Sequence, residues 1–153
     1  MPDQKKLDSL YMDIALRVSE MSYAVRKKVG AVLVNDENII SFGWNGVPRG
    51  FNNRCEDPVG EPYFKATEIG PITDLKTKEE VVHAEMNTIA KLARNGGTAL
   101  GSFLYLTLSP CFHCAKLILQ SGIKRVIYKE KYRDDKPIEF LKNGGIECTE
   151  LKD

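Results

Sequence analysis

The sequence lacks a long apolar stretch. No run approaches the ~20 consecutive apolar residues that a membrane-spanning helix needs. The first ten residues, MPDQKKLDSL, also lack the apolar segment of a secretory signal peptide. We therefore expect a cytoplasmic protein that has no membrane partner.

The sequence also lacks an excess of either charge. Its 22 Lys and Arg residues nearly balance its 21 Asp and Glu residues, which leaves a net charge of +1. A protein that binds nucleic acid usually carries a broad basic surface, so this balance favours a small ligand with local charge over a nucleic acid partner. The 153 residues are enough for one domain with its own core, and we expect a single domain over residues 1–153.

Cysteine and histidine are scarce, with four and two residues respectively. Four cysteines without a secretion signal are poor support for a disulfide framework. Cys111 and Cys114 have the CxxC spacing of metal ligands, whereas Cys55 and Cys148 are isolated and are interpreted as packed or surface thiols. His113, inside the CxxC segment, is expected to point away from the cysteine side chains.

The most informative pattern is His83-Ala84-Glu85, followed later in the chain by Pro110-Cys111-Phe112-His113-Cys114. One imidazole and two thiolates supply three ligands of a tetrahedral Zn²⁺ and leave the fourth position for water, as in catalytic zinc sites. H-x-E followed by P-C-x-x-C is the signature of zinc nucleobase deaminases. We therefore predict that His83, Cys111 and Cys114 bind zinc and that Glu85 is the catalytic proton shuttle rather than a ligand.

This prediction makes demands on local structure. Ser109 is the expected N-cap and Pro110 the expected first residue of a helix that places Cys111 and Cys114 one turn apart. His83 and Glu85 would point apart if both were inside a helix. They can share one site only if that site lies beyond the N-terminal end of their helix.

The remaining patterns predict alternating helices and strands, with a mixed sheet covered on both faces. Residues 44–77 contain four prolines and show no sustained period, so we interpret them as a long functional loop or insertion. The expected helices are 7–21, 79–93, 111–120 and 137–141, and the expected strands are 29–34, 39–43, 103–108, 124–128 and 146–149.

At the level of whole segments, the chain resembles the deoxycytidylate (dCMP) deaminases of the cytidine deaminase superfamily, including members from large DNA phages. The resemblance rests on the segments VGAVLV, GWNGVPRG, HAEMNTIAKLARNGG, LYLTLSPCFHCAKLILQSGIKRVIY, KYRDDKP and GGIEC. It implies a three-layer α/β/α sandwich with a five-stranded mixed sheet and one catalytic Zn²⁺ per chain. It also implies hydrolysis of dCMP to dUMP and ammonia, which supplies dUMP for thymidylate synthesis, by a homohexamer in the cytoplasm, or in the host cytoplasm if a phage encodes it.

The resemblance also assigns roles to residues of a nucleotide site. It implies that Asn45 contacts the sugar or base, that the backbone of Ala84 contacts the ring, and that Ser109 and Tyr132 line the site. The 5′-phosphate needs a cation, and the basic stretch Arg26-Lys27-Lys28 offers candidates, of which we favour Arg26 and Lys28. A solvated basic turn is the alternative interpretation of that stretch.

Regulation is a further implication, since relatives are often activated by dCTP with Mg²⁺ and inhibited by dTTP. The effector segment in this chain carries Trp44 where relatives usually have tyrosine. Tryptophan keeps an aromatic face for stacking but removes a hydroxyl. The implied effector residues are Gly43, Trp44, Asn45, Gly46, Pro48 and Arg49.

Three alternatives stay open at this point. Cytidine deaminases that act on free nucleosides typically have cysteine where this chain has His83, which disfavours that activity. A tRNA adenosine deaminase, or another nucleobase deaminase, would share the histidine and the HAE motif, although the near-zero net charge and the KYRDDKP segment disfavour tRNA. A zinc-stabilised binding module without turnover would need a fourth protein ligand and would give Glu85 no role.

Overall fold

The amphipathic segment near the N-terminus forms helix α1 (Gln4–Ser19) in the computed structural model of the chain, which describes residues 2–153. The helix begins earlier than its apolar stripe because Asp3 is the N-cap and its side chain accepts a hydrogen bond from the Lys5 backbone N–H. No helix in the described part of the chain is both long enough and apolar enough to cross a membrane.

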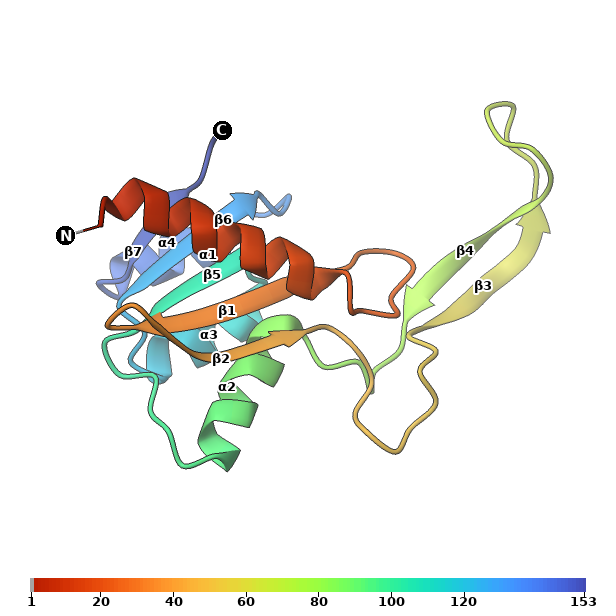
Figure 1. Cartoon of the computed structure of the whole chain (residues 1–153). Coiled ribbons are helices and arrows are strands. Elements are labelled where there is room, and N and C mark those ends of the chain that lie inside the picture. Colours follow the sequence, from red (N-terminus) through yellow and green to blue (C-terminus); the bar gives the residue numbers. More distant parts are fainter. Residues whose placement is uncertain (1) are drawn as a thin grey trace.

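The five-stranded sheet that the sequence predicts is present (Figure 1). Its order is β2-β1-β5-β6-β7, where β1 is antiparallel to both β2 and β5 and the last three strands are parallel. The sheet is therefore mixed, as expected. The strands are β1 (Gly30–Asn35), β2 (Asn38–Trp44), β5 (Phe103–Leu108), β6 (Arg125–Glu130) and β7 (Glu147–Glu150).

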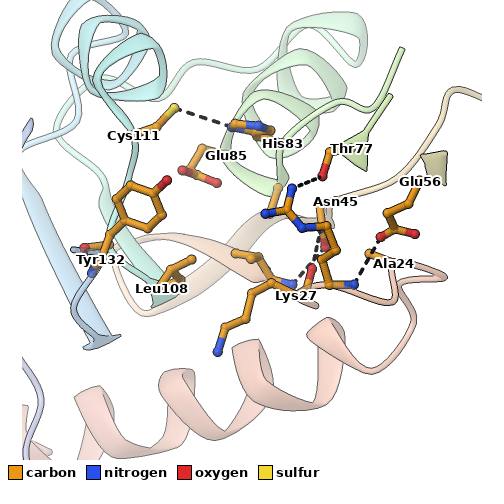
Figure 2. Close-up of a pocket in the computed structure, with 14 residues that line it drawn as sticks. Ala24, Lys27, Asn45, Glu56, Thr77, His83, Glu85, Leu108, Cys111 and Tyr132 are labelled. Atoms are coloured by element: carbon orange, nitrogen blue, oxygen red, sulfur yellow. Dashed lines mark hydrogen bonds between the residues drawn. The ribbon is translucent and has the colours of Figure 1, made fainter. Parts of the chain in front are cut away.

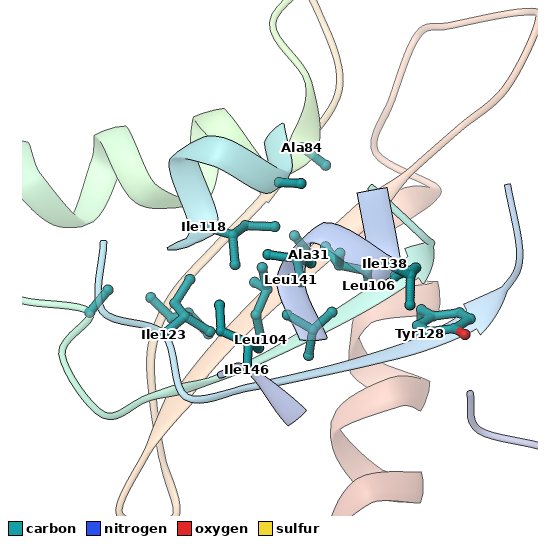
Figure 3. Packing of buried hydrophobic residues seen from close by; sticks show 14 of the residues in the cluster. Ala31, Ala84, Leu104, Leu106, Ile118, Ile123, Tyr128, Ile138, Leu141 and Ile146 are labelled. Carbon is teal, nitrogen blue, oxygen red and sulfur yellow. The ribbon is translucent and has the colours of Figure 1, made fainter. Parts of the chain in front are cut away.

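Helices cover both faces of this sheet and complete the α/β/α sandwich (Figure 1). On one face, α1 buries Tyr11 and Met12 against Val32 and Ile127 of the strands. The opposite face packs against the other three helices, and Figure 3 shows residues of that cluster, including Ala31, Leu104, Ile118 and Leu141. These helices are α2 (Ala84–Arg94), α3 (Phe112–Gln120) and α4 (Lys136–Asn143).

The core explains why the β1 sequence is apolar without alternation. Ala31 and Leu33 belong to the cluster under α2 to α4, whereas Val32 and Val34 belong to the cluster under α1. A strand buried on both faces needs apolar residues at every position, so the usual polar alternation is absent.

The segment 44–77 differs from the loop that the sequence predicts. It contains strands β3 (Glu56–Tyr63) and β4 (Ile72–Thr77), which form an antiparallel two-stranded ribbon that projects from the body of the molecule (Figure 1). Both faces of the ribbon are largely exposed, so no apolar period is required. Pro58, Gly60 and Pro62 further hide the strand signal, and the pairing register shifts between Val59 and Tyr63.

A buried ion pair joins α1 to β6, the neighbour of the central strand. Asp8 of α1 is 5% exposed and accepts two hydrogen bonds of 3.0 Å from the Arg125 guanidinium of β6. Its carboxylate also accepts a 2.7 Å hydrogen bond from the Tyr105 hydroxyl and a 2.9 Å bond from Gln4. Removal of Asp8 would leave the largely buried Arg125 guanidinium with only the exposed Glu147 carboxylate, 3.3 Å from its Nε, as a charged partner in the part of the chain that the structure describes.

We therefore expect Asp8→Ala to lower the free energy of unfolding by about 3–5 kcal/mol, the usual effect of breaking a buried pair. Urea denaturation of the variant and the parent chain measures this difference. The matched control is Asp13→Ala, at an exposed position of the same helix, for which we expect a change below about 0.5 kcal/mol. Equal effects of the two substitutions would contradict the role assigned to the pair.

The same pair predicts the pH dependence of stability. Burial raises the pKa of Asp8, but hydrogen bonds from Arg125, Tyr105 and Gln4 outweigh burial and leave the pKa below its ordinary value of 3.8. A lowered carboxyl pKa adds stability above the ordinary value, and that stability is lost as the pH falls through the lowered value. The stability gap between the parent chain and Asp8→Ala should therefore narrow when denaturation is repeated below a pH of about 4.

Candidate active site

Two helices begin at the same place in the structure, and their first residues carry the predicted metal ligands. His83 is the N-cap of α2 and Cys111 is the N-cap of α3, each with extended backbone angles. Neither side chain makes the hydrogen bond to the helix backbone that N-cap side chains usually make. Both side chains are therefore free to face each other, and Cys114 joins them from the first turn of α3.

The distances among the three side chains suit zinc. His83 Nδ1 lies 3.5 Å from Cys111 Sγ and 3.4 Å from Cys114 Sγ, and the three ligand atoms all lie within 4.8 Å of one another. A tetrahedral Zn²⁺ at ordinary bond lengths separates a sulfur ligand from a nitrogen ligand by about 3.6 Å. One imidazole and two thiolates therefore fit a zinc ion, and three protein ligands leave one coordination position open.

The two thiols do not ionise independently. The hydrogen bond with Cys114, and then that with His83, lowers the pKa of Cys111 to about 3, although burial opposes this shift. The same contact with Cys111, together with burial, raises the pKa of Cys114. The pair therefore shares one proton and one negative charge. A divalent cation between the sulfurs would replace that proton and hold both groups as thiolates.

Glu85 lies in the first turn of α2, and its side chain is 4% exposed. The helix starts one residue after His83, so the two side chains meet at its N-terminal end, as the i, i+2 spacing requires. Figure 2 shows the Glu85 carboxylate close to His83 and Cys111. Burial raises the pKa of Glu85, while its own backbone N–H and the nearby His83 oppose that effect. The carboxylate is thus placed beside the three ligand atoms and screened from bulk water.

A cavity of about 270 Å³ opens in front of these residues (Figure 2). Six of its lining residues come from the nucleotide and catalytic assignments made from the sequence, namely Arg26, Asn45, Ala84, Glu85, Ser109 and Tyr132. Lys28 does not line this cavity, whereas its neighbour Lys27 does. The cavity is also lined by Glu56 and Thr77, which no sequence motif indicates because they come from the irregular ribbon.

Ser109 has a different role from the N-cap that the sequence predicts. The N-cap of α3 is Cys111, and the helix begins at Phe112. The Ser109 hydroxyl instead accepts a 2.6 Å hydrogen bond from the Tyr132 backbone N–H, and its own N–H donates to the Glu130 carbonyl at 2.8 Å. The side chain therefore fixes the segment after β6 against the cavity, and it cannot also serve a helix that starts three residues later.

A second cavity, of about 640 Å³, lies beside the first. Gly43, Trp44, Gly46, Pro48 and Arg49, five of the six residues of the implied effector segment, line it. The sixth, Asn45, lines the first cavity together with His83 and Cys111.

The second cavity combines aromatic and basic side chains. Lys91 and Arg94 of α2 face it together with Arg49. The Lys91 ammonium lies 4.3 Å from the centre of the Phe42 ring and 5.6 Å from that of Trp44. Such a site can stack a base and bind phosphate groups.

Comparison with known proteins agrees with this geometry. A family model described as "Cytidine and deoxycytidylate deaminase zinc-binding region" matches residues 5–130. The chain belongs to this family. It is 36% identical to the deoxycytidylate deaminase of Enterobacteria phage T4 over 168 residues, which cover 91% of this chain and 86% of the relative.

Two further comparisons extend the similarity. The human deoxycytidylate deaminase is 39% identical over 127 residues, which cover 81% of this chain and 65% of the human protein. The dCMP deaminase of cyanophage S-TIM5, solved in complex with dCMP and dUMP, superposes with a TM-score of 0.81. It is 34% identical, and the match covers 99% of each chain. The family and its fold are therefore those that the sequence motifs predict.

Loss of a ligand should release the metal. We expect the purified parent chain to carry about one zinc per chain and Cys114→Ala to carry less than about 0.1, because two remaining ligands hold zinc weakly. Inductively coupled plasma mass spectrometry gives the metal content. Cys148→Ala is the control. Because Cys148 lies in β7, away from the cluster, this variant should keep its full zinc content. Full zinc occupancy in Cys114→Ala would mean that the ligand set is wrong.

Proposed function

We propose that this chain catalyses the hydrolytic deamination of dCMP to dUMP and ammonia, and so supplies dUMP for thymidylate synthesis. The observation that carries the proposal is the buried Glu85 carboxylate beside the His83, Cys111 and Cys114 cluster, at the end of a cavity sized for a small molecule. The similarity to dCMP deaminases, one of them solved with dCMP and dUMP, supports this substrate.

The residues divide the chemistry among them. Bound zinc supplies Lewis acidity, which makes water nucleophilic at neutral pH. Glu85 accepts a proton from the attacking water, passes it to the ring nitrogen and then delivers a proton to the departing amine. The water oxygen first bonds to the ring carbon. Glu85 then takes the second proton from the hydroxyl so formed and gives it to the amino group, so the C–N bond breaks, ammonia leaves, a carbonyl remains and the carboxylate is regenerated.

Substrate binding uses the rest of the cavity wall. Arg26 is the proposed cation for the 5′-phosphate, Asn45 and the Ala84 backbone are proposed to contact the nucleoside, and Ser109 and Tyr132 to line the site. Lys28 is not among the residues that line this cavity, so we propose no direct contact between it and the phosphate. A near-neutral chain supports a free nucleotide over tRNA as substrate.

We further propose that the second cavity binds an effector nucleotide, with dCTP and Mg²⁺ activating and dTTP inhibiting a cytoplasmic homohexamer. Its aromatic and basic lining supports a nucleoside triphosphate. Trp44 and Gly46 face this cavity, while Asn45 between them faces the first. Gly46 also exchanges backbone hydrogen bonds with Val82, the residue before His83. One short segment thus contacts both cavities and the start of α2.

The direct test is ammonia release by the zinc-loaded protein from dCMP, deoxycytidine, dCTP and a tRNA anticodon stem. We expect turnover of dCMP, with kcat/KM at least about 100-fold above that of the other substrates. Added dCTP should raise the rate and dTTP should lower it. Turnover of the tRNA stem alone would assign the chain to the tRNA adenosine deaminases, and no turnover of any substrate would favour a zinc-binding module.

Glu85→Gln isolates the proton shuttle. The amide keeps the size of the side chain but cannot carry protons, so we expect kcat for dCMP to fall by at least about 10³-fold. Zinc content should stay unchanged because Glu85 is not a ligand. Glu80→Gln, at an exposed position before α2, is the control and should retain full activity. Substantial residual turnover in Glu85→Gln would remove Glu85 from this role.

A further inference from the structure

The basic loop, residues 24–29 between α1 and β1, has no regular structure of its own. It carries Arg26 and Lys27 to the wall of the active-site cavity. The Lys27 ammonium is paired with the Glu130 carboxylate. Among residues 2–153, no carboxylate pairs with the Arg26 guanidinium, so its charge is available to an anionic ligand.

Side chains from two other parts of the chain hold the backbone of the basic loop. On the side of β2, Asn45 accepts a 2.8 Å hydrogen bond from the Val29 N–H and donates one of 2.8 Å to the Lys27 carbonyl. On the opposite side, Glu56 Oε1 accepts hydrogen bonds from the N–H groups of Val25, at 2.8 Å, and Arg26, at 3.2 Å. The loop is thus fixed on both sides of Arg26.

A carboxylate is unexpected at the position of Glu56. It is 6% exposed and lies on the wall of a cavity proposed to receive a phosphate, which it would repel. The two hydrogen bonds that it accepts from the loop backbone explain its presence, because bonds to a charged acceptor are stronger than those to a neutral one. The carboxylate therefore anchors the loop backbone rather than the ligand.

Thr77 acts on the side chain of the same arginine. Its hydroxyl accepts a 3.3 Å hydrogen bond from Arg26 Nη1, marked by a dashed line in Figure 2. Thr77 of β4 and Glu56 of β3 are direct partners across the ribbon, at its end nearest the body. One rung of the ribbon thus fixes both the backbone and the guanidinium of Arg26.

We propose that Glu56 and Thr77 are positioning residues that hold Arg26 for the 5′-phosphate, so that this rung of the ribbon determines the preference for a nucleotide over a nucleoside. The inference rests on the proposed function, because it assumes a nucleoside monophosphate in the cavity. A guanidinium held in place loses less conformational entropy on binding than a free one. Loss of the contacts that hold Arg26 should therefore weaken binding of the phosphate and leave binding of the nucleoside unchanged.

The test compares dissociation constants for dUMP and deoxyuridine, measured by isothermal titration calorimetry with the zinc-loaded chain. We expect Arg26→Ala to weaken dUMP binding about 10- to 100-fold and deoxyuridine binding less than about 3-fold. Glu56→Ala and Thr77→Val should each weaken dUMP about 3- to 30-fold with the same selectivity, and should add less than about 2-fold in the Arg26→Ala background.

Conservative and control variants distinguish a loss of Arg26 positioning from a general disturbance of the fold. Glu56→Gln keeps an oxygen that accepts the same N–H groups, so it should restore most of the dUMP affinity lost in Glu56→Ala. Thr73→Val, on the same strand as Thr77, and Tyr63→Phe, at the far end of β3, should leave both constants unchanged.

Two results would overturn the inference. One is an equal loss of dUMP and deoxyuridine affinity in Glu56→Ala and Thr77→Val. The other is a loss of dUMP affinity from these substitutions that is as large in the Arg26→Ala background as in the parent chain. Failure of the proposed function has a different signature, since the parent chain would then release no ammonia from dCMP whatever the variants do. If Glu56→Ala does not fold, Thr77→Val alone and in the Arg26→Ala background still decides between these outcomes, because it is expected to weaken dUMP binding selectively.

Discussion

The arrangement of the site depends on the meeting of two helix N-termini near the carboxyl end of β5, the central strand of the sheet. His83 and Cys111 occupy N-cap positions, where side chains usually bond back to the helix backbone, but these two side chains face each other instead. The first turns of α2 and α3 then bring Glu85 and Cys114 to the same point. The positive ends of both helix dipoles favour the thiolates and the carboxylate there. The sandwich provides the rigid support for this meeting, since each helix packs against the sheet along its buried face.

Much of this could be predicted from sequence, for reasons that particular residues make plain. Donor chemistry and spacing predict that His83, Cys111 and Cys114 come together beside Glu85, and the structure brings them together (Figure 2). The apolar β1 segment predicts a core on both faces of the sheet. The prediction that Ser109 is the N-cap of α3 was wrong, because its hydroxyl accepts a hydrogen bond from the Tyr132 N–H, which lies far away in sequence. The ribbon was missed because prolines and exposure on both faces remove the strand period. Glu56 and Thr77 meet only through that ribbon, so no local signal could indicate them.

The segment from Gly43 to Gly46 connects the parts of the molecule that the proposed function needs. Neighbouring residues of an extended chain point to opposite sides, so Trp44 and Asn45 face different cavities. Asn45 holds the basic loop, and Gly46 exchanges backbone hydrogen bonds with Val82, the residue before His83. The hydrogen bonds of this one segment therefore reach both the basic loop and the residue before His83.

The ribbon has one more consequence, which concerns contacts between molecules. Two projecting strands expose unpaired backbone groups on both outer edges, and such edges invite pairing with another chain. In β3, Pro58 and Pro62 have no N–H to donate, and the shift in register between Val59 and Tyr63 interrupts the ladder. Charged side chains such as Glu61 and Lys76 lie exposed along the same strands. The features that hide the ribbon from sequence analysis thus also protect it from strand-by-strand aggregation.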